Sequence, residues 1–376
     1  MSVQAKRSLK VEKLARIYDE EIAPMWGTRF GKMLLRNLTV PEKGQVLDIA
    51  CGTGYPTIEI LRRMSEGSRL IAIDASSAML DVARRKVADL GPLGKKGVFF
   101  RTESPVPKLS FADDVYDLVV CNLGLNEMPS LEVALRDFAR VTKRGGEVRC
   151  TLPIAGTFQE FHDLYREVLI KHDKHEQLDR LDRNIARYPT IEHIERCMKS
   201  ANLSGGLEYE EFSLLFKSSR EFFFAPVIEY GPLNEWKEIA GGGQEMQDVF
   251  WYIKEAIDAY FDGRPFQVTI KAGCIIGRKH EQRIVAVPVT LAPDLVIESS
   301  PFQIIEEADI DSDLLLPPRK IAAGSVRMAD PDELEVEELD ASDVSMDSDF
   351  ADDEPVAEQE LDAFIDGKKR PNHLDE

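Results

Sequence analysis

The chain has 376 residues, with 67 Asp and Glu against 47 Lys and Arg, and 43% of its residues are hydrophobic. This length allows one large domain with appendages or two domains. Residues 301–376 hold 24 acidic and 6 basic side chains, so the first 300 residues have a net charge of only −2. A duplex-binding surface needs an excess of Lys and Arg, which neither part has, so we expect no nucleic-acid partner.

Cysteines and apolar runs indicate the compartment. The five cysteines are an odd number and include no C-x-x-C pair, so neither a disulfide framework nor a metal site is predicted. The N-terminal MSVQAKRSLKVEKLARIYDEE carries charges throughout, and no stretch reaches the ~18 apolar residues of a spanning helix. We therefore expect a cytoplasmic protein with no membrane partner.

Short apolar runs alternate with amphipathic segments from about residue 46 to 153, which is typical of βαβ units in a parallel sheet. A glycine C-cap is expected where the last predicted helix of this region, which begins at residue 129, meets the fifth strand. Ser76 or Ser77 is expected to cap the helix after the second strand. The first four predicted strands cover residues 45–50, 69–75, 97–104 and 116–125, and the fifth ends at residue 153.

The alternation stops after residue 153. A strand is predicted at 208–218 and another at 266–279, with a helical stretch between them that is interrupted at Gly241–Gly243. The sequence thus predicts an α/β fold with a doubly wound, mostly parallel, Rossmann-like sheet of seven strands and a helical insertion. The predicted parts are an N-terminal helical lid (1–44), a cofactor-binding core (45–153), an acceptor-side insertion with the last strands (154–281), and a linker and tail (282–376).

The segment from residue 282 onward is broken by prolines and becomes strongly acidic from Glu306. Such a composition buries too little apolar surface to offset the entropy of ordering, so we expect a disordered acidic tail. Its charge makes a basic protein partner for the tail an open alternative.

The strongest local signal is VLDIACGTG at residues 46–54. Gly52 and Gly54 allow a sharp turn after a strand and a close approach of a ligand to the backbone. Asp74 ends the next strand, where an acid can accept hydrogen bonds from the two hydroxyls of a ribose. The third glycine of a dinucleotide fingerprint is replaced by Thr57, so a nucleoside without pyrophosphate fits better.

These features resemble the class I S-adenosylmethionine-dependent methyltransferases, especially the branch with the ubiquinone and menaquinone C-methyltransferases and the malonyl-carrier-protein O-methyltransferases. The resemblance rests on VLDIACGTG, on Asp74, on FADDVYDLVVCNLGLNEM and on LRDFARVTKRGGEV. It covers residues 10–153 well and 154–280 in outline. It implies S-adenosyl-L-methionine as cofactor.

The resemblance also implies which residues contact the cofactor. Asp74 would bind the ribose, and Ala75 and Met79 would touch the adenosine. The family often has an Asp after strand three for the adenine amino group; here Glu103 or a backbone carbonyl would serve. The residues implied to line or flank the methionine portion are Asp48, Ala50, Gly52, Gly54, Asn122 and Leu123, and the implied lid residues are Tyr18, Trp26 and Arg29.

Several of these residues have structural alternatives. Asp48 could stabilise the turn, Asp74 could cap a helix, Trp26 could be ordinary packing, and Asn122 could bond loop backbone. Adjacent acids at Asp113–Asp114 are more typical of a solvated turn than of a metal site.

His162, His172 and His175 could supply a base, but charged neighbours favour an exposed helix with the last two on one face. No catalytic residue is identified from the sequence. The run Phe222–Phe224 favours core over a substrate wall.

We therefore expect an S-adenosylmethionine-dependent methyltransferase that acts on an oxygen, nitrogen or carbon atom of a small, moderately apolar acceptor. The aromatic residues between 154 and 265 favour such an acceptor over a charged polymer. Two alternatives remain: a cofactor-binding regulatory or scaffold protein that recruits a basic partner through its acidic tail, and a dinucleotide-dependent oxidoreductase, which Thr57 disfavours.

Overall fold

Seven strands form one sheet with the order β3-β2-β1-β4-β5-β7-β6. The computed structural model describes residues 3–95 and 97–280, so the predicted linker and acidic tail lie outside the described residues. Strands β1 to β5 run parallel, while β7 is antiparallel to both β5 and β6. The strands are β1 (Gln45–Ile49), β2 (Arg69–Asp74), β3 (Gly97–Thr102), β4 (Tyr116–Asn122), β5 (Thr142–Pro153), β6 (Leu203–Phe216) and β7 (Phe266–Lys279).

Helices connect the parallel strands and build the part after β5. The helical segments up to β5 are α1 (Val3–Ile17), the π-helical η1 (Tyr18–Gly27), α2 (Thr28–Leu35), α3 (Thr57–Arg63), α4 (Ser77–Ala88), the short η2 (Leu93–Lys95) and η3 (Gly124–Glu127), and α5 (Leu131–Val141). The later ones are α6 (Gln159–Lys171), α7 (His175–Ile185), α8 (Ile191–Ser200), α9 (Ser219–Phe223), α10 (Pro226–Glu229), α11 (Leu233–Ala240) and α12 (Gly243–Phe261).

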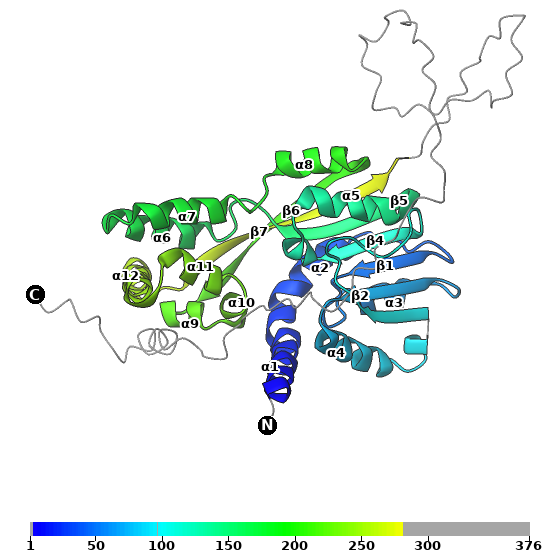
Figure 1. The fold of residues 1–376 in the computed structure, drawn as a ribbon, viewed down its shortest axis with the longest axis horizontal. Coiled ribbons are helices and arrows are strands. Elements are labelled where there is room, and N and C mark those ends of the chain that lie inside the picture. Colours follow the sequence, from blue (N-terminus) through cyan, green and yellow to red (C-terminus); the bar gives the residue numbers. More distant parts are fainter. Residues whose placement is uncertain (1–2, 96, 281–376) are drawn as a thin grey trace, which may run out of the picture. The chain divides into compact units, whose positions relative to one another are not determined.

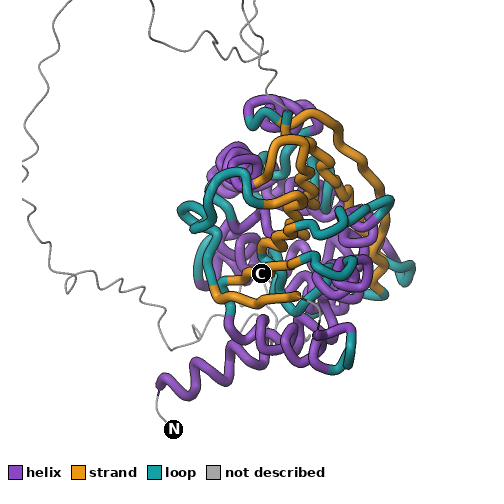
Figure 2. Tube along the Cα trace, turned by 90° about the vertical axis from the view of Figure 1, so that its right-hand side faces the viewer, coloured by secondary structure: helices purple, strands orange, loops and turns teal. Residues whose placement is uncertain are grey.

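The sheet is covered on both faces, as the doubly wound prediction requires. One core contains side chains of α2, α3 and α4 with alternate residues of the strands, such as Val46 of β1. The other contains α5 and α8 with the intervening residues, such as Leu47. Figure 1 shows α5 and α8 above the strands and α4 below them, and Figure 2 shows strands between helices from a second side. Strands buried on both faces explain the continuous apolar runs in the sequence.

The two late strands and their insertion are confirmed. Helices α9 to α12 lie between β6 and β7 in the chain, and Gly241 ends α11 with a φ of 108° before α12 begins at Gly243. Phe222 and Phe223 are buried in the core, as expected for the aromatic run. Helices α6, α7, α9, α11 and α12 gather at the left of Figure 1, whereas α8 lies at the top beside α5.

Two local predictions are wrong. Helix α5 has no glycine C-cap, because Thr142 ends it and already begins β5; the Lys279 ammonium donates to the carbonyl oxygens of Arg140 and Thr142 instead. His172 and His175 do not share a helical face, because His172 follows the last residue of α6 and His175 is the first residue of α7. Both differences come from contacts or chain reversals that helical spacing does not reveal. The expected exposure of His162 is wrong as well, because Phe158 and Trp236 of α11 pack against it and leave it 1% exposed.

Candidate cofactor site

The carboxyl ends of β1, β2 and β4 meet at one edge of the sheet. Strand β1 lies between the other two and is parallel to both, with Ile49 opposite Ile73 and Cys121. The strand order reverses here, since the chain goes from β1 to β2 on one side and later to β4 on the other. In open parallel sheets this switch point is the usual place for a ligand.

Asp74 ties the end of β2 to the turn after β1. One carboxylate oxygen accepts a hydrogen bond from the Gly52 amide at 2.8 Å, and the other accepts from the Ser76 amide at 2.8 Å. Burial raises the pKa of Asp74 above its usual value, and the two backbone hydrogen bonds oppose this shift. The helix cap itself is Ser76, whose hydroxyl accepts from the Met79 amide at 3.4 Å. The acid is therefore oriented across the glycine turn rather than serving as the cap.

The turn after β1 approaches helix α4 closely. A Cβ atom at Gly54 would lie 3.1 Å from the Cβ of Ala83, and Gly54 has a φ of 95°. Both the backbone conformation and the contact distance require glycine at this position. Ala50 also has a positive φ, of 54°, and lies against Gly124 in the loop after β4. The turn is thus held on one side by α4 and on the other by the loop after β4.

Asp48 lies beneath the turn and is completely buried. One carboxylate oxygen accepts from the Thr57 hydroxyl at 2.5 Å, while Oδ1 has no hydrogen-bond partner among the described residues. Burial raises the pKa of Asp48 to about 7, although the Thr57 hydrogen bond opposes the shift. From the sequence, Thr57 argues only against a dinucleotide site. Its hydrogen bond to Asp48 was not predicted.

The buried state of Asp48 predicts a pH-dependent stability. The folded protein holds this proton more tightly than the unfolded chain does, because folding raises the pKa from 3.8 to about 7. The stabilisation is fully present below the unfolded pKa and is lost as the pH rises through about 7. Between about pH 5 and about pH 8, the wild type should lose on the order of 2 kcal/mol more unfolding free energy than Asp48→Asn. Urea unfolding of both proteins at the two pH values measures this; equal losses would contradict it.

Asn122 connects the end of β4 to the N-terminal segment. Its side-chain amide donates to the carbonyl oxygen of Gly27 at 3.1 Å, and its side-chain oxygen accepts from the Thr151 hydroxyl at 2.7 Å. Leu123 follows in a left-handed conformation, with its amide bonded to the Thr151 carbonyl at 3.1 Å. The Asn122 side chain therefore bonds backbone, which was the structural alternative to a contact with the cofactor. The same hydrogen bond positions η1 at this edge of the sheet.

The three predicted lid residues separate into two groups. Tyr18 lies over the turn, since a Cβ atom at Gly52 would be 3.6 Å from its ring. Trp26 instead stacks on Phe158, with ring centroids 6.1 Å apart and an interplanar angle of 8°. Arg29 is exposed and lies 5.1 Å from the centroid of the Phe212 ring in β6. Tyr18 alone of the three is next to the glycine turn.

The predicted adenosine side follows β2 and β3. Ala75 is exposed and Met79 half-buried at the start of α4. The amide of Glu103 donates to the Asp74 carbonyl at 3.0 Å, which brings Glu103 next to Asp74. Its carboxylate pairs with Arg101 at 2.6 Å and accepts from the Ser110 amide at 3.1 Å. The Glu103 carboxylate thus closes its own loop, and a contact with adenine stays a prediction.

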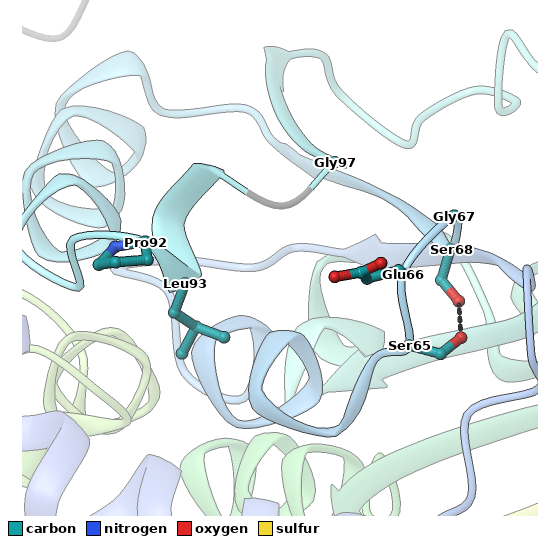
Figure 3. Close-up of a pocket in the computed structure, with 7 residues that line it drawn as sticks. All are labelled: Ser65, Glu66, Gly67, Ser68, Pro92, Leu93 and Gly97. Carbon is teal, nitrogen blue, oxygen red and sulfur yellow. Dashed lines mark hydrogen bonds between the residues drawn. The ribbon is translucent and has the colours of Figure 1, made fainter.

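A hollow of about 560 Å³ lies at the other end of the strands (Figure 3). Its lining comes from the segments just before β2 and β3, whereas Asp74 ends β2. The hollow is therefore separate from the site around Asp74. The residues that line the hollow are Ser65, Glu66, Gly67, Ser68, Pro92, Leu93 and Gly97.

Among the described residues there is no group of three His, Cys, Asp or Glu side chains that could hold a metal ion.

The chain is similar in sequence to known methyltransferases. Residues 46–146 match the family model described as a methyltransferase domain. The demethylmenaquinone methyltransferase of Halalkalibacterium halodurans is 31% identical over 134 residues, which are 36% of this chain and 53% of that enzyme. The enzyme of the same name from Staphylococcus aureus is 26% identical over 207 residues, 52% of this chain and 80% of that one.

Among solved structures, the YcgJ protein of Bacillus subtilis aligns with a TM-score of 0.45 and 20% identity, over 67% of this chain and 98% of that one. The chain spans only about half the length of the first of these two relatives. The family match spans β1 to the start of β5, the part that holds the glycine turn, Asp74 and Asn122. Over residues 46–146 the chain matches a methyltransferase domain, and it is similar in sequence to the demethylmenaquinone methyltransferases.

Proposed function

We propose that the chain transfers a methyl group from S-adenosyl-L-methionine to an oxygen, nitrogen or carbon atom of a small, moderately apolar acceptor. The observation that carries this proposal is Asp74, held across the glycine turn at the switch point of the sheet. The family match of residues 46–146 supports the reaction class. The names of the relatives specify demethylmenaquinone as their acceptor, and we propose an acceptor of similar apolar character here.

The site residues fit a bound adenosine and methionine. Each carboxylate oxygen of Asp74 accepts one backbone hydrogen bond and keeps a further lone pair, so both can accept from ribose hydroxyls. We propose that Asp74 binds the ribose and that Ala75, Met79 and Glu103 contact the adenosine. Tyr18 is proposed to cover the bound cofactor. The methionine portion is assigned to Asp48, Ala50, Gly52, Gly54, Asn122 and Leu123.

The unpartnered Oδ1 of Asp48 supports this assignment. A completely buried carboxylate oxygen without a donor is costly, and a donor supplied by a bound molecule relieves that cost. Trp26 and Arg29 contact the aromatic residues Phe158 and Phe212 rather than the turn. We therefore assign these two residues to the acceptor side.

The bound cofactor supplies an electrophilic methyl group on a sulfonium. The chain need only hold donor and acceptor in line and exclude water, and alignment of this kind lowers a barrier by several kcal/mol or more, up to about 10 kcal/mol. We propose that segment η1 helps to hold the methyl donor and the acceptor in line. Asn122 fixes its last residue, Gly27, and Lys86 pairs with Asp19 near its beginning, at 2.6 Å. A base is required only for acceptors that must lose a proton.

The remaining proposals concern location and organisation. All five cysteines are buried as free thiols, which supports a reducing, cytoplasmic location. Within residues 3–95 and 97–280, no helix has the length and apolar character needed to span a membrane.

We propose residues 1–44 as lid, 45–153 as cofactor-binding core and 154–281 as acceptor side. Residues 282–376 are proposed as an acidic tail that binds a basic partner.

The test uses a metabolite extract and S-adenosylmethionine with a deuterated methyl group. We expect one small molecule to gain the labelled methyl group in the presence of the full chain, and S-adenosylhomocysteine to form in equal amount. Mass spectrometry of the extract measures both products. An extract in which no molecule gains label, while the chain binds S-adenosylhomocysteine, would contradict transfer and leave a binding protein.

A further inference from the structure

Segment η1 is held to the rest of the molecule near both of its ends. At its last residue, the carbonyl oxygen of Gly27 accepts a hydrogen bond from the Asn122 side-chain amide at 3.1 Å. Near its first residue, the Asp19 carboxylate pairs with the Lys86 ammonium of α4 at 2.6 Å. The Asp19 side chain is 22% exposed and that of Lys86 is 37% exposed. Solvent therefore screens this ion pair only in part.

Tyr18, the residue before Asp19, connects this end of η1 to the cofactor site. A Cβ atom at Gly52 would lie 3.6 Å from the Tyr18 ring, and a Cβ atom at Gly27 would lie 3.8 Å from its hydroxyl oxygen. The ring thus reaches from the glycine turn after β1 to the other end of η1. Because Tyr18 and Asp19 are adjacent in the chain, a displacement of Asp19 moves the ring relative to the turn.

Helix α4 contacts both the glycine turn and η1. A Cβ atom at Gly54 would lie 3.1 Å from the Ala83 Cβ, so Ala83 supports the turn. Lys86 follows three residues later, which places it on the same face of the helix. The residue that caps α4, Ser76, also donates its amide hydrogen to Asp74. One helix therefore orients Asp74, supports the turn and holds η1.

We propose that Lys86 is a positioning residue of the cofactor site, which keeps Tyr18 over the bound cofactor through its ion pair with Asp19. This inference rests on the function proposed above and names a contact that governs cofactor release. The measured Kd rises as the covered state becomes less populated, because only that state binds the cofactor at full strength. The sequence alone does not reveal this role, since Lys86 and Asp19 are 67 positions apart.

The test measures the Kd and the dissociation rate of S-adenosylhomocysteine with the immobilised full chain by surface plasmon resonance. Lys86→Met keeps the length of the side chain and removes its charge. We expect Lys86→Met and Asp19→Asn each to raise the Kd about threefold to fivefold, mostly through faster dissociation. The change is no larger because α1 also packs against α4 and restrains the beginning of η1. Lys86→Arg keeps the positive charge and should bind like the wild type.

Two controls separate the ion pair from net charge. Arg85→Met removes a positive charge from the adjacent position of α4, whose side chain is exposed, and should leave the Kd unchanged. The double variant Asp19→Asn/Lys86→Met should bind as weakly as either single variant and no weaker, because each substitution removes the same contact. At about 1 M salt, the Kd of the wild type should approach that of the two single variants, since salt screens the pair.

The outcomes distinguish the inference from the proposed function. A wild-type chain that fails to bind S-adenosylhomocysteine would overturn the proposed function. Normal binding by the wild type, with the same Kd and dissociation rate in Lys86→Met and Asp19→Asn, would overturn the role of the ion pair alone. Additive losses in the double variant, or an equal loss in Arg85→Met, would overturn it as well. If Lys86→Met does not fold, Asp19→Asn decides the result.

Discussion

Replacement of Asp74 by alanine is expected to weaken the binding of S-adenosylhomocysteine about a hundredfold. The carboxylate is held toward the glycine turn by the Gly52 and Ser76 amides, and two charge-assisted hydrogen bonds to a ribose would be lost. A hundredfold change corresponds to about 2.7 kcal/mol, within the range for bonds to a charged group. Isothermal titration calorimetry measures the affinity.

Two variants make this test specific. Asp74→Asn keeps the shape of the side chain and one acceptor oxygen, so it should lose less affinity than Asp74→Ala. Asp81→Ala removes an exposed acid of α4 that pairs with Arg84 at 2.7 Å, and it should bind like the wild type. Equal affinity of Asp74→Ala and wild type would exclude Asp74 from the cofactor site.

Replacement of Phe222 by alanine is expected to reduce the unfolding free energy by about 3 to 5 kcal/mol. Phe222 of α9 is fully buried and packs against aromatic rings of α6, α11, β6 and β7. Its ring centroid lies 5.1 Å from that of Phe161 in α6, 5.2 Å from Phe216 in β6 and 5.1 Å from Phe266 in β7. The residual cavity would therefore lie where the helices meet the sheet.

Phe224 provides the matched control, two residues away in the same run. It is only partly buried and packs beside Arg220 at 5.8 Å, so Phe224→Ala should cost about 1 kcal/mol or less. Urea denaturation of both variants gives the two values. If the two substitutions cost the same, Phe222 would not be the packing centre between α6, β6 and β7.

The pH prediction for Asp48 and the aromatic cluster around His162 share one physical basis. Each is a polar side chain with almost no exposure to solvent and with an unpartnered atom among the described residues. Burial disfavours the charged form in both, which raises the pKa of the carboxyl and lowers the pKa of the imidazole.

Features that depend on neighbouring residues were predictable. The first strand was expected at residues 45–50 and lies at Gln45–Ile49, and Ser76 caps α4 as expected. Asp74 was expected at the end of the second strand, and it lies beside the glycine turn because parallel strands place their carboxyl ends together. These predictions rest on backbone preference and on the burial of both sheet faces.

Partners far apart in the chain were not predictable. Trp26 stacks on Phe158 and Arg29 lies beside Phe212, whereas the Thr57–Asp48 bond, between residues nine positions apart, was missed although it is local. The contacts of Trp26 and Arg29 join residues more than a hundred positions apart, and no periodicity in the sequence predicts them. Because of such contacts, two of the three residues expected over the cofactor turn lie beside aromatic rings instead.

The sequence by itself therefore determined the doubly wound sheet, the glycine turn and the acid at the end of β2, since these follow from local backbone preferences and strand burial. Only the tertiary structure decided which oxygen of Asp48 lacks a donor, where Trp26 packs, and that His162 is enclosed by rings. The physical reason is that hydrogen-bond satisfaction and desolvation depend on all atoms around a group, and most of those atoms come from distant parts of the chain.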